Sequence, residues 1–229
     1  MNPKKNPPRA ASLVVATAHT EKGLRQAGRL RPGGVGFVEV RLDTLGADGP
    51  PLKAALESIR IPVLLTARHP VEGGGERLSL SERRALLQAF LLKASAVDVE
   101  LRSVASMSAI LESARLRKIK RVISFHDFRG TPGLVRLRQI VQRSARAGAD
   151  IVKIATHLRS ANDLAVLLLL QTAAKVPLAT MGMGRLGKVS RLVLAAAGSR
   201  LNYGYLDKPQ VSGQWPALEL VERIEEVLP

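Results

Sequence analysis

Short apolar segments rich in β-branched residues alternate along the chain with longer segments whose apolar positions recur every three to four residues. The first kind is typical of buried strands, and the second of helices with one buried face. Strands are expected at residues 12–17, 36–42, 61–68, 96–101, 121–126, 149–156, 177–181 and 200–205. Helices are expected at about 21–30, 52–59, 82–94, 104–117, 133–148, from 160 or 162 to 175, and 188–197, with a last helix ending at 228.

This order of elements predicts the fold class. Strict alternation of strand and helix indicates a parallel sheet, and eight repeats of about 25–30 residues fit a single-domain (β/α)8 TIM barrel. The barrel is expected to span residues 12–229, after a basic, proline-containing tail at 1–11 that is expected to be disordered. Ser81 is expected to cap the third long helix, with Glu82 in its first turn.

Composition narrows the class of protein. Hydrophobic residues make up 46% of the chain but aromatic residues only 3%, so the core must be aliphatic. The absence of cysteine excludes disulfides and thiolate metal sites. The longest apolar run, Leu164 to Leu170, is too short to span a bilayer, and no signal-peptide pattern is present. A cytoplasmic protein without a membrane partner is therefore expected.

A formal net charge of +16 is compatible with binding either nucleic acid or a small anion. The basic residues, however, are scattered over segments expected to be helical, and aromatic side chains that could stack on bases are scarce. We therefore expect no nucleic-acid partner.

Lys153 lies in the middle of the apolar strand expected at 149–156. Burial penalises the charged form of an amine, and a neutral amine is a nucleophile that condenses with ketones or aldehydes. Two structural interpretations compete with catalysis: the side chain extends to the strand end, or it pairs with a carboxylate. The strand by itself does not choose between them.

Other polar residues lie late in the expected strands or just after them. They are Glu39, Arg41, Arg68, Glu72, Glu100 and His126. The carboxyl ends of barrel strands open onto one face, so these groups and Lys153 should meet in one pocket. Each alone is compatible with a structural ion pair, but the set favours an active site. An amine nucleophile, an imidazole that moves protons, a carboxylate that orients it and arginines for an anion fit an imine-dependent lyase or aldolase.

The ordered motifs resemble those of type I 3-dehydroquinate dehydratase over essentially the whole of residues 12–229. The motifs are Glu39-Val-Arg41-Leu-Asp43, Thr66-Ala-Arg68, Glu72-Gly-Gly, Ser124-Phe-His126-Asp127-Phe128, Val152-Lys153-Ile154-Ala155, Met181-Gly-Met183-Gly, Ser190-Arg191-Leu192 and Gly213-Gln214. Each motif alone is weak, but their conjunction in this order is specific.

The resemblance implies a hydro-lyase of the shikimate pathway that converts 3-dehydroquinate to 3-dehydroshikimate. It implies Lys153 as the Schiff-base lysine, His126 as the general acid/base and Glu72 as the residue that positions it. The implied substrate contacts are Glu39, Arg41, Arg68, Arg191, Gln210 and Gln214, with Arg191 and Gln214 at the carboxylate and Glu39 and Arg68 at the ring hydroxyls. It also implies a homodimer, with no metal and no organic cofactor.

Two positions depart from the family pattern. Gln210 occupies the place of a serine usually found four residues before the glutamine, and either Gln210 or the nearby Ser212 could take over its role. Ala16 replaces a small polar residue often found on the first strand.

The motifs admit two alternative interpretations, a dinucleotide-binding site and a Schiff-base aldolase. Gly182-Met-Gly184-Arg-Leu-Gly187 matches a dinucleotide-binding fingerprint, but too little chain follows it to complete such a domain, and a glycine-rich turn that approaches an anionic substrate fits better. A Schiff-base aldolase of the same barrel class would also use a lysine on strand six. The Ser-Phe-His-Asp-Phe and Ser190-Arg191 motifs favour the dehydratase.

Overall fold

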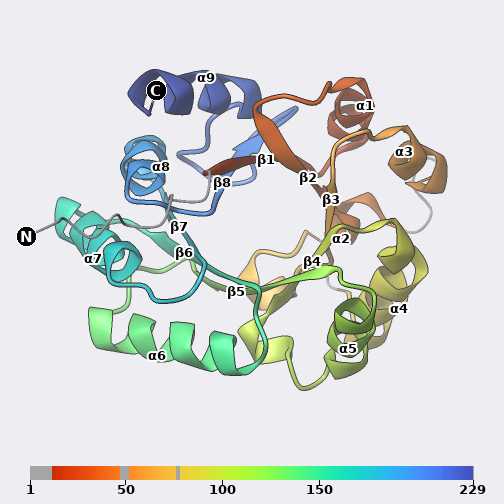
Figure 1. The fold of residues 1–229 in the computed structure, drawn as a ribbon, viewed down its shortest axis with the longest axis horizontal. Helices are drawn as coiled ribbons and strands as arrows, with labels where there is room; N and C mark the ends of the chain where they lie inside the picture. The colour runs from red at the N-terminus through yellow and green to blue at the C-terminus, as the bar shows by residue number, and fades with distance from the viewer. Residues whose placement is uncertain (1–11, 47–51, 76–77, 229) are drawn as a thin grey trace, which may run out of the picture.

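Eight parallel strands surround a central axis, and the helices lie outside them (Figure 1). The computed structural model describes residues 12–46, 52–75 and 78–228, so the tail expected at 1–11 lies outside the described residues. The strands are β1 Leu13–Ala18, β2 Val35–Arg41, β3 Val63–Thr66, β4 Ala96–Glu100, β5 Lys120–Asp127, β6 Ile151–His157, β7 Leu178–Met183 and β8 Leu201–Tyr205. The (β/α)8 barrel predicted from the sequence is confirmed.

Longer helices follow the strands, with short helical turns between them. The helices are α1 Glu21–Arg29, α2 Leu42–Leu45, α3 Leu52–Ser58, α4 Leu80–Phe90, α5 Ser108–Leu116, α6 Leu134–Arg146, α7 Ala161–Thr172, α8 Gly187–Ala196 and α9 Ala217–Val227. The 3-10 turns are η1 Pro70–Glu72, η2 Leu91–Lys93 and η3 Leu101–Ser103. Among the described residues, no helix is both long and apolar enough to cross a bilayer.

The strands pair in the order β7-β6-β5-β4-β3-β2-β1-β8. The two ends of this order meet at the remaining seam, where the backbone N–H of Arg200 donates to the carbonyl of Leu178 at 2.9 Å. Figure 1 shows the resulting ring, with α9 and α6 on opposite sides of it.

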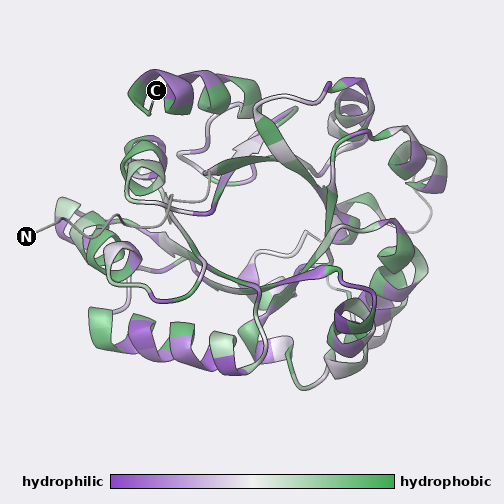
Figure 2. Ribbon diagram, viewed as in Figure 1, coloured by the Kyte–Doolittle hydropathy of each residue, from purple (hydrophilic) through white to green (hydrophobic). Residues whose placement is uncertain are grey.

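The helices bury one face against the outside of the sheet. In α6, Leu137 and Ile140 are buried, whereas Arg138 and Arg143 are exposed. The same division appears in Figure 2, where purple and green segments alternate along α6. This pattern is the helical periodicity from which the element was predicted.

The inside of the barrel is filled in layers, because alternate residues of a strand point to the same face. An apolar layer contains one or more residues from every strand: Val15, Phe37, Leu64, Ala96, Val122, Ile151, Ala179 and Leu201, with Met181, Tyr203 and Ala155 above them. Two residues further along most strands the side chains are polar: Thr17, Glu39, Thr66, Asp98, Ser124 and Lys153, all buried. The register pairs Thr17 with Glu39, Thr66 with Asp98, and Ser124 with Lys153. The polar residues therefore form a second layer directly above the apolar one.

Several boundaries differ from those predicted. β5 continues to Asp127, so His126 lies within the strand instead of ending it. β3 ends at Thr66, which leaves Arg68 in the loop beyond it. The cap of α4 is Ser79, not Ser81: the Ser79 side chain accepts from the backbone N–H of Glu82, and the Glu82 carboxylate accepts from the Ser79 N–H at 2.7 Å. This reciprocal pair satisfies two backbone donors, whereas Ser81 is already inside the helix.

Replacing the cap should destabilise the protein. Ser79→Ala removes the capping hydroxyl and should lower the free energy of unfolding by about 1 kcal/mol. Ser81→Ala is the matched control and should change it by less than about 0.5 kcal/mol. Urea unfolding of the two variants measures the difference, and an equal effect of both would contradict the assignment of Ser79 as the cap.

Candidate active site

A cavity opens at the carboxyl ends of the strands. It is lined by nine of the candidate side chains from the sequence: Glu39, Arg41, Arg68, Glu72, His126, Lys153, Arg191, Gln210 and Gln214. Glu100, which was also expected in this pocket, is buried and does not line it. Thr17, Phe128, Met181, Met183 and Tyr203 contribute further walls. The residues come from strands, loops and α8, and they meet because all the carboxyl ends open onto the same face.

Lys153 lies in the polar layer and is only 3% exposed. Its Nζ is 3.1 Å from Asp98 Oδ2 and 3.7 Å from Glu39 Oε1. The ring of Tyr203 covers it, with its centroid at 3.9 Å. The pairing of Lys153 with a carboxylate, one of the interpretations that the strand sequence left open, is therefore present, because β4 and β2 supply two carboxylates inside the barrel. The amine lies in an ion pair and also faces the cavity.

Asp98 is the main polar residue that the sequence analysis missed. It accepts from both terminal nitrogens of Arg68 at 2.8 Å, from Ser124 at 2.6 Å and from Lys153. Burial alone would raise the pKa of this carboxyl, but the charges of Arg68 and Lys153 outweigh burial and hold the pKa well below its ordinary value. The alternation Val97-Asp98-Val99-Glu100 was the available signal, because it points both acids to the same face of the strand.

Glu100 and Arg83 extend this network towards the helices. Glu100 accepts from Arg68 Nη1 at 3.0 Å and from the backbone N–H of His69 at 2.9 Å. Arg83, on α4, donates to the other oxygen of Glu100 and to the carbonyl of Ala67. Arg68 is thus held on several sides, which fixes its guanidinium against the cavity wall.

His126 and Glu72 form a second group. Glu72 Oε2 accepts the backbone N–H of His126 at 2.9 Å and lies 3.0 Å from the ring Nδ1. Burial, with the charges of Arg68 and Lys153, lowers the pKa of His126 well below its ordinary value, so the free imidazole is neutral at pH 7. When Glu72 is ionised, Nδ1–H donates to it, and the lone pair of Nε2 is left for the cavity.

Burial raises the pKa of Glu72 to about 7, although the charge of Arg68 opposes the shift. The carboxyl therefore changes ionisation close to neutral pH, in direct contact with the imidazole. A strongly shifted acid beside a histidine in a cavity is typical of a catalytic site.

Arg191 is a buried cation whose partners, among the described residues, are backbone carbonyls alone. Its Nε donates to Tyr203 at 2.9 Å, and Nη1 donates to Gly182, Gly187 and Gly213 at 2.7–2.9 Å. Burial lowers its pKa to about 10, because no carboxylate offsets the loss of solvent. An uncompensated guanidinium at a cavity wall is suited to an anionic ligand.

The comparisons with known proteins agree with this geometry. Residues 11–226 match the model of the family described as type I 3-dehydroquinase. The chain belongs to this family. It is therefore a hydro-lyase.

Relatives of similar length show the same likeness. The 3-dehydroquinate dehydratase of Methanocella arvoryzae is 34% identical over 210 residues, which cover 91% of this chain and 94% of that protein. That of Methanothermobacter thermautotrophicus is 35% identical over 205 residues, covering 89% and 90%. The crystal structure of the 3-dehydroquinate dehydratase from Geobacillus kaustophilus superposes with a TM-score of 0.82 at 28% identity, covering 95% of this chain and 91% of that one.

The loop before α9 is where this dehydroquinase departs from the family pattern, and the structure separates the two candidate residues. Gln210 lines the cavity, whereas Ser212 is exposed and does not line it. Gln214 Oε1 accepts the backbone N–H of Gln210 at 2.7 Å, so Gln214 also orders the loop. Ala16 is buried and does not line the cavity, whereas the adjacent Thr17 lines it and donates its hydroxyl to Glu39.

Two of the glycines at 182–187, the segment that matches the dinucleotide-binding fingerprint, pack against the loop before α9. Gly213 has φ +82°, and a side chain there would meet the carbonyl of Gly184 and the Cα of Gly187. The glycine-rich turn thus allows the close approach of a second backbone segment, and its approach to an anionic ligand stays a prediction. Among the described residues, no group of three or more His, Asp or Glu could hold a metal ion.

Asp98 should contribute strongly to stability, with a defined pH dependence. Asp98→Asn leaves Arg68 and Lys153 without their main counter-charge and should cost about 3–5 kcal/mol at pH 7. The folded pKa of Asp98 is depressed, so the stabilisation is full above the unfolded pKa, near 4, and is lost as pH falls below it. The deficit of the variant relative to wild type should therefore shrink below about pH 4.

Urea unfolding at pH 7, 5 and 3.5 measures this deficit. The control is Asp150→Asn, which removes an acid whose side chain is 42% exposed and paired with Arg121. It should cost no more than about 1 kcal/mol. A pH-independent deficit in Asp98→Asn would contradict the charge assignment.

Proposed function

We propose that this chain dehydrates 3-dehydroquinate to 3-dehydroshikimate through an imine on Lys153, as a step of the shikimate pathway towards aromatic amino acids. The observation that carries the proposal is the position of the Lys153 amine, which lies at the floor of the cavity lined by His126 and Arg191. Membership of the dehydratase family supports the reaction, and the side-chain geometry supports the mechanism.

The first step is attack of the Lys153 nitrogen on the substrate ketone. The ammonium must first lose a proton. The neutral imidazole of His126 is a suitable acceptor, and the charge of Lys153 is one of the causes that lower its pKa. The new C–N bond forms as the carbonyl oxygen becomes a hydroxyl. That hydroxyl takes the proton held by His126 and leaves as water, which yields a cationic imine and returns the imidazole to its neutral form. Asp98, Glu39 and the face of Tyr203 already surround a cation at this nitrogen, so they stabilise the iminium as well.

The second step is the elimination. The iminium acidifies the neighbouring C–H, and Nε2 of His126 takes that proton to give an enamine. The enamine then expels the β-hydroxyl, which leaves as water with the proton carried by His126. Hydrolysis of the remaining imine releases the enone product and restores Lys153.

Substrate orientation follows from the charges of the cavity wall. Arg191 binds the carboxylate, because it is the buried cation without a carboxylate partner, and Gln214 and Gln210 lie on the same side. Glu39 and Arg68 bind ring hydroxyls at the opposite wall. Arg41 is braced by Asp43 at 2.7 Å and by the carbonyl of Gly73 at 2.9 Å, which holds it at the mouth.

The proposal includes a cytoplasmic homodimer that needs no metal or organic cofactor. Its support is the family resemblance, and light scattering of the purified chain tests the dimer.

Borohydride trapping tests the nucleophile. Reduction in the presence of 3-dehydroquinate should add the ligand's mass to wild-type protein at Lys153, because the imine becomes a stable amine. Lys153→Ala should lose both the adduct and turnover, since no other group supplies the electron sink. An adduct on another lysine, or turnover that survives in Lys153→Ala, would overturn the mechanism.

His126→Ala separates imine formation from proton transfer. It should still form the adduct, though more slowly, whereas elimination should fall by at least about 10²–10⁴-fold. The control is His19→Ala, which removes a histidine that does not line the cavity and should leave the rate of elimination unchanged. Normal turnover in His126→Ala would exclude the histidine as the acid/base.

Gln210 rather than Ser212 should bind substrate in place of the usual loop serine. Gln210→Ala should raise KM about threefold to tenfold, the size expected for one lost hydrogen bond. Ser212→Ala is the matched loop control and should leave KM unchanged, because Ser212 is exposed. Steady-state kinetics compares the two, and the reverse order of effects would show that the loop shifts to bring Ser212 to the substrate.

A further inference from the structure

Arg102 contacts the far side of the carboxylate that orients the histidine. It lies in η3, immediately after β4, and its Nε is 3.0 Å from Glu72 Oε1. Glu72 Oε2 is the oxygen that faces both the backbone N–H and the ring of His126. The side chain of Glu72 is 3% exposed and that of Arg102 is 48% exposed, so a buried carboxylate is linked to the solvent by one arginine.

The ionisation of Glu72 determines what the imidazole presents to the cavity. An ionised Glu72 accepts Nδ1–H, so Nε2 carries a lone pair and can take a proton from substrate. A protonated Glu72 donates to Nδ1 instead, and the neutral ring then carries its proton on Nε2. One added proton therefore converts the base into a donor without any movement of the ring.

Charges of both signs act on Glu72. Burial favours the protonated carboxyl and raises its pKa to about 7. Glu100 adds to this effect, whereas Arg68, the backbone N–H of His126 and Arg102 oppose it. Arg68 is also bound by Asp98 and Glu100, whereas Arg102 forms its ion pair with Glu72 itself.

We propose that Arg102 is a positioning residue of the dehydratase, which keeps Glu72 ionised and thereby keeps the lone pair of His126 Nε2 directed at the substrate. Arg102 does not line the cavity and acts through Glu72. The kinetic part of this inference rests on the proposed function, and the titration of Glu72 does not.

The groups around His126 itself are unaffected by a change at Arg102. Arg68, Lys153 and Arg41 disfavour the protonated ring, and Asp98 favours it. Among the described residues, none of these four forms a hydrogen bond or ion pair with Arg102. A change in the histidine's behaviour after substitution of Arg102 is therefore transmitted by Glu72.

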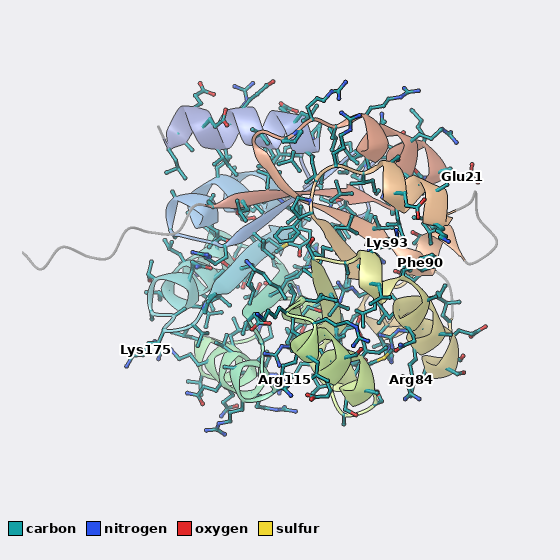
Figure 3. The ribbon with its side chains drawn as sticks, turned by 45° about the vertical axis from the view of Figure 1, so that its right-hand side comes forward. Glu21, Arg84, Phe90, Lys93, Arg115 and Lys175 are labelled. Carbon is teal, nitrogen blue, oxygen red and sulfur yellow. The ribbon has the colours of Figure 1, made fainter. Side chains whose placement is uncertain are left out.

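Three variants test the proposal. Arg102→Leu removes the charge and the donor but keeps an aliphatic side chain, and Arg102→Lys keeps the charge. The matched control is Arg84→Leu: Arg84 is exposed on α4, labelled in Figure 3, and its Nη2 donates to the carbonyl of Ser106 at 2.6 Å, near Arg102 in the chain. Both positions thus carry an exposed or half-exposed cation.

Arg102→Leu should raise the lower apparent pKa of kcat/KM by about half a unit, the size expected for a half-exposed ion pair. The loss should be about threefold near pH 6 and absent above pH 8.5, because Glu72 is then ionised in both proteins. Arg102→Lys should restore the wild-type profile, and Arg84→Leu should not shift it. Added salt should shift the wild-type profile in the same direction as Arg102→Leu, because it screens the exposed arginine.

A second measurement separates this inference from the function. The side-chain carboxyl resonance of Glu72, assigned by its loss in Glu72→Gln, should titrate at higher pH in substrate-free Arg102→Leu than in wild type. Equal midpoints in the two proteins, or an equal shift in Arg84→Leu, would overturn the role of Arg102. If wild type titrates as expected but lacks dehydratase activity, the proposed function is wrong while the contact of Arg102 with Glu72 stands.

Discussion

Charge compensation inside the barrel is the constraint on which the rest of the structure depends. Glu39, Asp98 and Glu100 carry negative charge there, and Arg68, Lys153 and Arg83 carry positive charge within ion-pair distance of them. Each buried ion costs several kcal/mol unless it is paired and hydrogen-bonded, so three acids and three bases form a balanced unit. Lys153 can be held at the floor of a cavity only because β4 and β2 bring acids to it inside the barrel.

Much of this arrangement could be predicted from the sequence. Alternate residues of a strand share a face, and parallel strands end on the same side of the barrel, so the pattern predicts which side chains meet. Nine of the candidate side chains line one cavity because every strand end opens onto the same face, whereas Glu100 lies buried behind the wall. The partners of Lys153 were not readable, since they depend on the register between strands and not on the pattern within one. Asp98 resembles any acid in an apolar strand until β4 is placed beside β3 and β5.

Sequence rules for helix caps also failed where two serines could each cap the same helix. Ser79 and Ser81 are both good capping residues, and the choice depends on where the preceding loop lets the first turn begin. The sequence also left open the choice between Gln210 and Ser212 in the loop before α9, and in the folded loop Gln210 lines the cavity while Ser212 is exposed. Such choices are made by tertiary contacts, which the local pattern does not contain.

The balanced unit also limits how the sequence can change over time. Arg68 bonds to Asp98, Glu100 and Ser124, which belong to two different strands, and Asp98 in turn holds Lys153. Loss of any one charged member exposes its partners to the full cost of burial, so a neutral replacement at one position is tolerated only with a matching replacement elsewhere. Related sequences should therefore exchange these residues in pairs or not at all, and correlated substitution among β4, β6 and the loop after β3 would be the historical trace of a buried net charge held near zero.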